Sequence, residues 1–190
     1  MTQYRFTARD GTKVLIREPR PTDVRQLMDF INGFVKEPKS GLLIDKKVNL
    51  KEEKAWLKGW IADIRRREGL LLLVEVDGKI KGSCSVLRLK WKSSHVADLG
   101  IALSGDIRGK GIGEALMDKA ITLARKRMRG LEIIQLKAFS YNERALEFYR
   151  KLGFVEVGRV PRVNKEGKNY YDDVLMTRSL HVVQRRRDGA

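Results

Sequence analysis

The sequence predicts a mixed α/β fold, in which a mostly antiparallel meander is followed by strand–helix–strand units, with helices on both faces of the sheet. Three observations predict this fold. Two apolar segments flank Asp77-Gly78, a dipeptide typical of a two-residue hairpin turn. A later apolar strand runs through a glycine-spaced turn into an amphipathic helix. The remaining chain alternates strand, helix and strand.

One strand and one helix are predicted at the start of the chain. Residues 13–17 form the strand, and Pro21-Thr22-Asp23 begin the helix, which ends at Asn32-Gly33. The apolar residues of this helix recur on one face and are Val24, Leu27, Met28 and Ile31.

A second helix is predicted after a segment with no clear period. Residues 34–48 contain Pro38 and Gly41 and are expected to form a loop with a short helix. Asn49 and Glu52 then resemble a capping box at the start of a helix to about residue 67. Its apolar residues, interpreted as core or as the wall of a substrate pocket, are Trp56, Leu57, Trp60, Ile61 and Ile64.

The central part of the chain is predicted to be a meander that leads into a helix. Residues 70–76 and 80–89 form the hairpin, and residues 96–103 continue the sheet. A helix over residues 112–128 follows and is closed by Gly130.

The C-terminal part is predicted to complete the mixed sheet. Residues 131–138 form a strand and residues 142–152 a helix. A last hairpin pairs residues 154–160 with residues 170–178 around a turn at 164–167.

Composition predicts one globular domain. A chain of 190 residues with 42% hydrophobic content can bury a core of its own. Its longest apolar run, residues 70–74, is too short to cross a bilayer, and the N-terminus does not resemble a signal peptide. We therefore expect a soluble, cytoplasmic protein. Cys84 is interpreted as buried filler, and His95 and His181 are too few and too far apart to predict a metal site.

The chain is strongly basic. Its 40 Lys and Arg against 24 Asp and Glu give 40 − 24 = +16. An anionic partner such as RNA or a ribosome, a thermophile-like surface and simple solubility each account for this charge. The basic residues are spread along the chain and are not interleaved with aromatic residues, so nucleic-acid binding is expected to be at most weak and non-specific. Residues 184–188 contain the one basic cluster.

The turn between residues 103 and 112 has the features of a phosphate cradle. Glycines let an anion approach the unpaired N–H groups of a helix N-terminus, and Arg108 and Lys110 add positive charge. A dinucleotide fingerprint requires glycine where Glu114 stands. A P-loop requires Ser or Thr where Gly111 stands. Both of these alternatives are therefore excluded.

The pattern that fits is Arg-x-x-Gly-x-Gly over residues 108–113, which resembles the acetyl-CoA pyrophosphate loop of the GNAT superfamily of N-acetyltransferases. Residues 142–154 resemble the second hallmark of that family, Asn-x-x-Ala-x-x-Phe-Tyr-x-x-x-Gly-Phe. A Tyr-x-Asp-x-x-x-Met pattern at residues 170–176 and the opening from Ile16 to Asp23 also match. The resemblance spans roughly residues 13–180.

This resemblance implies a GNAT-like fold and acetyl-CoA-dependent transfer of an acetyl group directly to a primary amine. The acceptor is left open between a protein amine, Nα or lysine, and a small amine such as a polyamine. A non-catalytic acyl-CoA-binding regulator or an RNA-associated module is the alternative of another class. Residues 1–180 would form the N-acetyltransferase domain and residues 181–190 a flexible basic tail. Neither a metal nor a membrane is expected, and a homodimer is left open.

The resemblance also implies site residues. Tyr149 would protonate the leaving thiolate, because a phenol with a pKa of about 10 can donate to a thiolate with a pKa of about 8.5; the alternative is a core tyrosine. Asp98 stands where many relatives have a glutamate base acting through water, or else it ends a strand. Asp172 and Asp173 would contact the acceptor or only solvent, and alternation allows at most one to point inward. The residues expected to bind the cofactor are Ile101, Ala102, Leu103, Arg108, Gly109, Lys110, Gly111, Ile112, Gly113, Asn142 and Tyr149.

Overall fold

The computed structural model describes residues 3–35, 37 and 40–180. Within these residues, one eight-stranded sheet has the order β1-β2-β3-β4-β5-β6-β8-β7. The strands are β1 Gln3–Thr7, β2 Lys13–Arg17, β3 Gly69–Val76, β4 Lys79–Arg88, β5 Val96–Leu103, β6 Ile133–Phe139, β7 Val155–Glu166 and β8 Asn169–Ser179. Only β5 and β6 pair in parallel, so the predicted mixed, mostly antiparallel sheet is confirmed.

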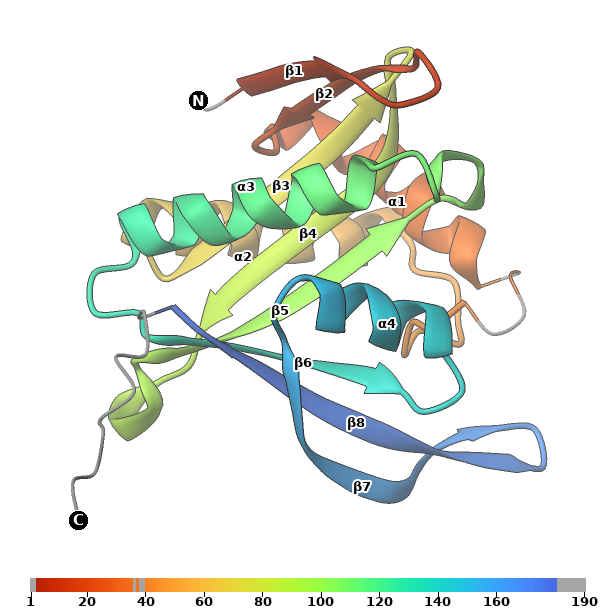
Figure 1. The fold of residues 1–190 in the computed structure, drawn as a ribbon. Helices are drawn as coiled ribbons and strands as arrows, with labels where there is room; N and C mark the ends of the chain where they lie inside the picture. The colour runs from red at the N-terminus through yellow and green to blue at the C-terminus, as the bar shows by residue number, and fades with distance from the viewer. Residues whose placement is uncertain (1–2, 36, 38–39, 181–190) are drawn as a thin grey trace.

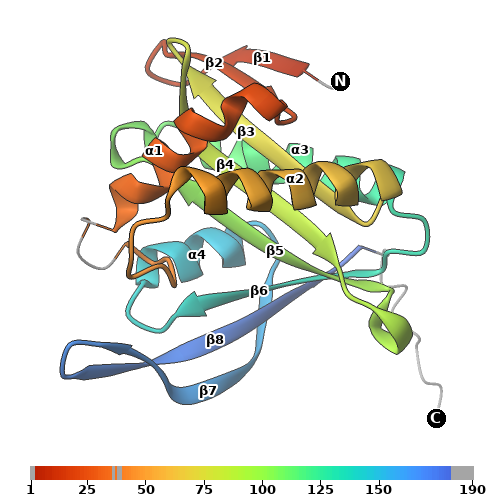
Figure 2. The same ribbon diagram turned by 180° about the vertical axis from the view of Figure 1, so that it is seen from behind.

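Helices cover both faces of this sheet, as predicted (Figures 1 and 2). The longer helices are α1 Val24–Phe34 and α2 Leu50–Arg66 on one face, and α3 Ile112–Arg127 and α4 Glu143–Lys151 on the other. Three short 3-10 turns are η1 Pro21–Asp23, η2 Trp91–Ser93 and η3 Gly105–Ile107. None of the described helices is long and apolar enough to span a membrane.

The central strand β3 explains the two-layer core. Its apolar run is buried on both faces, as expected of a strand covered by helices on each side. Leu70, Leu72 and Val74 pack with the α3 side, whereas Leu71 and Leu73 pack with α1 and α2. The capping box predicted for α2 is also present, because Asn49 accepts from the N–H of Glu52 at 3.1 Å and Glu52 accepts from the N–H of Asn49 at 2.8 Å.

The N-terminal region differs from the prediction in two places. Strand β1 precedes the expected first strand and pairs with β2 from Gln3–Arg17 to Thr7–Lys13. This edge strand is mostly exposed, so backbone pairing defines it rather than burial. Helix α1 continues through Gly33, because Phe34 is buried and contacts Phe30 with ring centroids 5.1 Å apart. No short helix occurs in the described residues between α1 and α2.

The last hairpin is longer than predicted. β7 extends through the expected turn to Glu166, and the chain reverses at Gly167-Lys168, with Gly167 at φ 58. The pairing shifts between Val160 and Asn164, where β7 carries extra residues opposite β8. Such a bulge bends and twists a strand, and in Figure 1 the hairpin projects from the body of the sheet.

A buried ion pair accounts for Arg17 and Asp23, which lie in the N-terminal segment that resembles the family. The Arg17 guanidinium donates to both carboxylate oxygens of Asp23, at 2.7 and 2.9 Å, and to Glu75 at 2.8 Å. Arg17 and Asp23 are almost fully buried. These two residues therefore tie β2 to the start of α1 and serve the fold.

Candidate active site

Glycines shape the cradle that joins β5 to α3. Gly109 and Gly111 have φ angles of 81° and 83°, a region that favours glycine. In the described part of the chain, the backbone N–H groups of Gly109, Gly111, Ile112 and Gly113 have no backbone acceptor. Four donors gathered at a helix N-terminus suit an anion such as the diphosphate of acetyl-CoA. The residues present therefore fit the expected cofactor.

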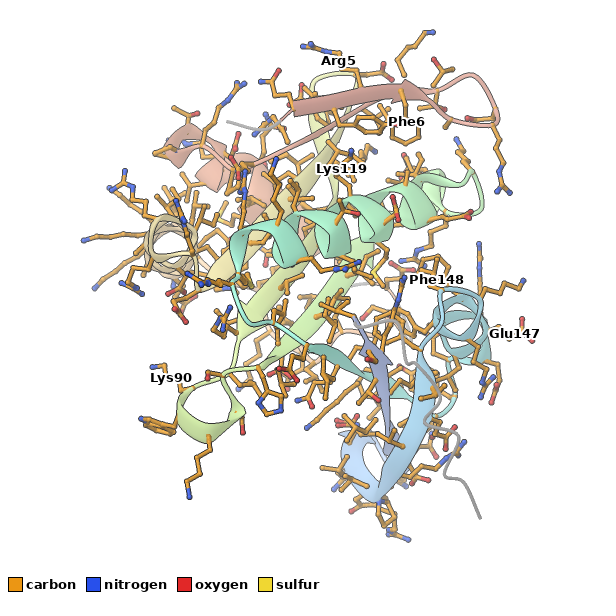
Figure 3. All side chains as sticks on the ribbon, turned by 60° about the vertical axis from the view of Figure 1, so that its left-hand side comes forward. Arg5, Phe6, Lys90, Lys119, Glu147 and Phe148 are labelled. Carbon is orange, nitrogen blue, oxygen red and sulfur yellow. The ribbon has the colours of Figure 1, made fainter. Side chains whose placement is uncertain are left out.

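Glycine is required at position 113 for a different reason than at position 111. A Cβ at Gly113 would lie 3.1 Å from Leu103 Cδ1 and 3.4 Å from the Phe148 ring. Figure 3 shows Phe148 on α4, below α3. The absence of a side chain at Gly113 thus lets the first turn of α3 pack closely on β5 and α4.

The β1–β2 hairpin brings charged side chains to this cradle. The Arg9 N–H donates to the Lys110 carbonyl at 3.3 Å, and a Cβ at Gly111 would lie 3.2 Å from Arg9 Nε. Arg9 pairs with Glu114 at 3.2 Å, and Lys110 pairs with Asp10 at 2.8 Å. The hydrogen bond from Lys110 lowers the pKa of Asp10 to about 2. Such exposed pairs are weak, so an arriving phosphate can compete for both cations.

A groove lies beside these pairs, between the hairpin and the first turns of α3. Its volume is about 500 Å³. Its lining residues include Phe6, Arg9, Lys110, Gly111, Ala115 and Leu152. The groove therefore opens onto the side of the cradle that carries the basic residues.

Arg108 is held on the other side of the loop. Its Nε donates to the Leu103 carbonyl at 2.8 Å, and its two terminal nitrogens donate to Glu37 at 2.8 and 3.3 Å. Its guanidinium carbon lies 5.9 Å from the centre of the Phe34 ring. Arg108 thus ties the segment after α1 to the end of β5. The phosphate contact expected of Arg108 stays a prediction and requires the ion pair with Glu37 to open.

The edge of β5 opens next to the cradle. β5 pairs with β6 only over Val96–Asp98 and Ile133–Gln135. Beyond that point β5 continues to pair with β4 as far as Leu103, while β6 continues to pair with β8 as far as Phe139. The two strands diverge, with α4 beside the gap (Figure 1). Among the described residues, the backbone of residues 99–103 therefore has no strand partner on this edge. This stretch includes Ile101, Ala102 and Leu103, which are expected to bind the cofactor.

Tyr149 lies on α4 and belongs to the same core cluster as Ala97 and Leu99 of β5. Its side chain is almost buried and packs between Phe148 and Phe154, with ring centroids 5.5 and 6.1 Å away. Its hydroxyl has no hydrogen-bond partner among the described residues. Burial, and secondarily Cys84, raises the pKa of Tyr149 well above 10. The phenol therefore keeps its proton at neutral pH and can serve as a donor.

Cys84 is buried filler, as expected. It is fully buried in the core, and burial raises the pKa of its thiol to about 12. A protonated, inaccessible thiol is a poor nucleophile.

Asn142 caps the N-terminus of α4. Its Oδ1 accepts from the Ala145 N–H at 3.2 Å. A Cβ at Gly41 would lie 3.0 Å from Asn142 Nδ2, so glycine lets the α1–α2 segment approach the start of α4. Contact between Asn142 and the cofactor stays a prediction.

Asp98 stands where β5 and β6 part. It is the last β5 residue paired with β6, and its carboxylate accepts from Gln135 Nε2 at 2.7 Å. Its neighbours Ala97 and Leu99 belong to the α3–α4 core together with Tyr149. Since strand residues alternate, the exposed Asp98 faces the opposite side of the sheet. The two expected proton-transfer residues thus lie on opposite faces of the opening.

The acidic pair on β8 is divided as alternation predicts. Asp172 accepts from the N–H of Arg162 at 2.9 Å, which holds the bulge of β7. Asp173 is buried, accepts from Asn164 Nδ2 at 2.6 Å and pairs in register with Phe139. Asp173 is therefore the member of the pair that lies on the same sheet face as Phe139.

Two tyrosines that the sequence argument missed extend this face. Tyr141 stacks on Phe139 with centroids 5.2 Å apart and meets Tyr171 edge-on at 4.6 Å. The Tyr141 hydroxyl donates to Glu166 at 3.3 Å, and burial together with Glu166 raises the pKa of Tyr141 to about 12. A sequence signal for Tyr141 is its position directly before Asn142.

Arg9 and Glu37 were also missed, with different signals. Asp10-Gly11 is a hairpin turn signal between the Tyr4-x-Phe6 and Val14-x-Ile16 alternations, and it could have revealed β1 and hence Arg9. Glu37 lies in a segment without periodicity, so no local signal marked it.

Several known proteins that are similar to this chain are named as N-acetyltransferases. An uncharacterized N-acetyltransferase, MJ1207, of Methanocaldococcus jannaschii is 38% identical over 108 residues, which cover 53% of this chain and 45% of that protein. The L-amino acid N-acetyltransferase AaaT of Escherichia coli is 29% identical, covering 63% of this chain and 74% of that protein. An N-alpha-acetyltransferase of Sulfurisphaera tokodaii is 25% identical, covering 86% and 93%.

A solved structure supports the same assignment for the fold. The crystal structure of an acetyltransferase of the GNAT family from Streptococcus pneumoniae superimposes with a TM-score of 0.78 at 27% identity. The superposition covers 88% of this chain and 99% of that one. The fold expected from the two sequence motifs is thus confirmed over most of the chain.

The family itself is established by the central part of the sequence. Residues 37–154 match the model described as the acetyltransferase (GNAT) family. This range contains the glycine cradle, the open edge of β5 and the helix that carries Tyr149. With these features in place, the chain belongs to the GNAT family of acetyl-CoA-dependent N-acetyltransferases.

Proposed function

We propose that this protein acetylates the α-amino group of a polypeptide N-terminus. The observation that carries the proposal is the fork at Asp98, where β5 leaves β6. The open edge of β5 leads from this carboxylate to the anion cradle at the start of α3. One continuous path thus joins a proton acceptor, unpaired backbone donors and a phosphate site.

The cradle and the open edge bind and orient. The N–H groups of residues 109–113, aided by Arg9 and Lys110, hold the diphosphate. Acetyl-CoA, when bound, supplies the acetyl thioester. Alternate N–H groups of β5 beyond Asp98 point into the opening and donate to the acetyl carbonyl, where negative charge develops during transfer. Donors already fixed in a strand need no reorganisation to do this.

Asp98 and Tyr149 move protons on opposite faces. Asp98 accepts the proton that the amine loses, directly or through water. Tyr149 is protonated at neutral pH, as a phenol with a pKa of about 10 or higher must be, and it donates a hydrogen bond and then its proton to the departing thiolate.

The choice of an α-amine rests on acidity and on charge. The pKa of an N-terminal α-amino group is about 7.7–8.0, against about 10.4 for lysine. Near pH 7 the α-amine is therefore neutral several hundred times more often, so a much larger fraction of it can attack the thioester. Asp98 and the buried Asp173 also favour an incoming ammonium over an anion. The S. tokodaii relative is an N-alpha-acetyltransferase by name, which agrees with this acceptor.

A matched set of acceptors tests the proposal. Peptides with a free N-terminus and no lysine would be compared with N-terminally blocked peptides that contain lysine, with free L-amino acids and with spermidine. Thiol release would be measured, and mass spectrometry would locate the acetyl group. We expect the highest kcat/KM for the free peptide N-terminus. Higher kcat/KM for lysine, for spermidine or for free amino acids would refute the proposed acceptor.

A further inference from the structure

A tryptophan stands exposed at the turn between β4 and β5. Trp91 keeps 88% of its surface exposed, although a large aromatic side chain gains most from burial. Its φ angle is 55°, which a bulky residue rarely adopts. Strained residues persist only where their surroundings hold them, and they gather at functional sites.

The turn that displays Trp91 is firmly built. The Leu89 N–H donates to the Val96 carbonyl at 2.9 Å, and the Ser94 N–H donates to the Trp91 carbonyl at 3.1 Å. Arg88 donates to the Ser94 carbonyl at 2.6 Å and to the Arg129 carbonyl at 2.9 Å. These bonds clamp the turn to the loop after α3, so the indole is presented by a fixed backbone.

Basic residues surround this tryptophan. Lys90 and Lys92 flank it, and both are exposed. In Figure 3, Lys90 lies at the rim of the molecule, away from Glu147 and Phe148 on α4. Glu132, whose N–H donates to the His95 carbonyl at 2.8 Å, is an acidic neighbour of the turn.

The described chain ends beside the same turn. The Leu180 N–H donates to the Glu132 carbonyl at 2.7 Å, which places the end of β8 there. In the sequence, Arg185, Arg186 and Arg187 follow within seven residues of Leu180. The described end of β8 therefore lies on the side of the molecule that carries Trp91.

We propose that residues 88–95, the Trp91 turn, form a binding site for single-stranded nucleic acid. A base stacks on the Trp91 indole, and Lys90 and Lys92 contact the phosphates on either side of it. Base stacking on an aromatic side chain combined with flanking cations is how proteins bind single strands without sequence preference. The sequence argument treated the basic residues as scattered. In the structure, two exposed lysines flank an exposed aromatic residue on a hydrogen-bonded turn.

The surroundings favour a nucleic acid over a lipid surface. Interfacial membrane binding scales with the buried apolar area, whereas Trp91 is flanked by lysines and followed by Ser93 and Ser94. A single stacked base requires only one aromatic face. The turn also lies at the far end of β5 from the cradle, about 25 Å along an eight-residue strand. The protein could therefore bind a nucleic acid and acetyl-CoA at the same time, at separate sites.

The test measures binding of a fluorescently labelled oligouridylate of about 12 nucleotides by anisotropy, at about 0.05 M salt. Trp91→Ala should weaken binding about 5- to 150-fold, the effect of losing one stacked base. Trp91→Phe should retain most of the affinity. The matched control is Trp56→Ala, because Trp56 is also exposed, at 44%, but lies on α2. Acetyl-CoA affinity measured by calorimetry should be the same in all variants.

Two further measurements complete the test. Lys90→Ala and Lys92→Ala should each reduce the slope of log affinity against log salt by about 0.7. Absence of binding in the wild type, or equal losses for Trp91→Ala and Trp56→Ala, would overturn the proposal. Trp91-dependent binding to anionic phosphatidylserine vesicles without oligouridylate binding would assign the turn to a membrane surface instead. Each of these outcomes leaves the acetyl-transfer proposal standing, because it concerns other residues.

Discussion

Replacing Tyr149 by phenylalanine should lower the catalytic rate while leaving the stability of the protein almost unchanged. The hydroxyl has no hydrogen-bond partner among the described residues, and the ring packs between Phe148 and Phe154. Tyr149→Phe keeps that packing and removes only a desolvated hydroxyl. We therefore expect the free energy of unfolding to change by less than about 1 kcal/mol.

The catalytic effect should be much larger. Loss of a general acid lowers kcat by about 10²- to 10⁴-fold, equivalent to about 2.7–5.4 kcal/mol of transition-state stabilisation. Acetyl-CoA affinity should change little, because the cradle on α3 is untouched.

The pH dependence provides an independent readout. Burial raises the pKa of Tyr149 in the folded state above its unfolded value of about 10. The wild type should therefore lose no activity through this group below pH of about 10. Its folding stability should begin to fall above that pH, because the unfolded chain releases the proton first. Tyr149→Phe should lack this part of the alkaline destabilisation.

The assay combines steady-state kinetics, calorimetry and urea unfolding. Tyr4→Phe is the matched control, because Tyr4 is exposed on β1, where its ring stacks on Phe6 and lies under the Lys119 ammonium, far from α4. An unchanged kcat for Tyr149→Phe would return Tyr149 to the role of a core residue. A large loss of stability would show instead that its hydroxyl has a structural partner.

Three other predictions test the cradle, the fold and the core. Gly111→Asp should weaken acetyl-CoA binding at least about 10-fold in calorimetry, because a side chain strains the loop at its φ of 83° and its carboxylate repels the diphosphate; Gly130→Asp, with a similar φ of 77° but open surroundings, should not. Arg17→Ala should destabilise the protein by about 3–5 kcal/mol in urea unfolding, because it leaves a buried carboxylate unpaired, whereas Arg66→Ala at an exposed pair should cost under about 1 kcal/mol. Cys84, with its pKa raised to about 12, should resist alkylation at pH 8 until the chain unfolds; rapid native labelling would contradict its burial.

The sequence by itself determined the class of fold, and it predicted which loop binds the cofactor. Apolar runs with Asp77-Gly78 between them specify a hairpin wherever they occur, because turn chemistry and strand alternation are local properties. The glycines at 109 and 111 likewise indicated a turn that an anion can approach, and in the structure both residues have positive φ angles. Sequence motifs also placed Tyr149 on the helix that lies beside the opened strand.

Tertiary structure decided which groups meet. Glu37 binds Arg108 across 71 positions of sequence, and Arg9 reaches the cradle only because β1 pairs with β2 at the sheet edge. The divergence of β5 from β6 at Asp98 depends on β6 following β8, which no local pattern encodes. The sequence does not show that Trp91 is exposed, because its exposure depends on how the turn between β4 and β5 folds. Long-range pairing sets these features, because the residues that satisfy each other's charges and backbone groups are far apart in the chain.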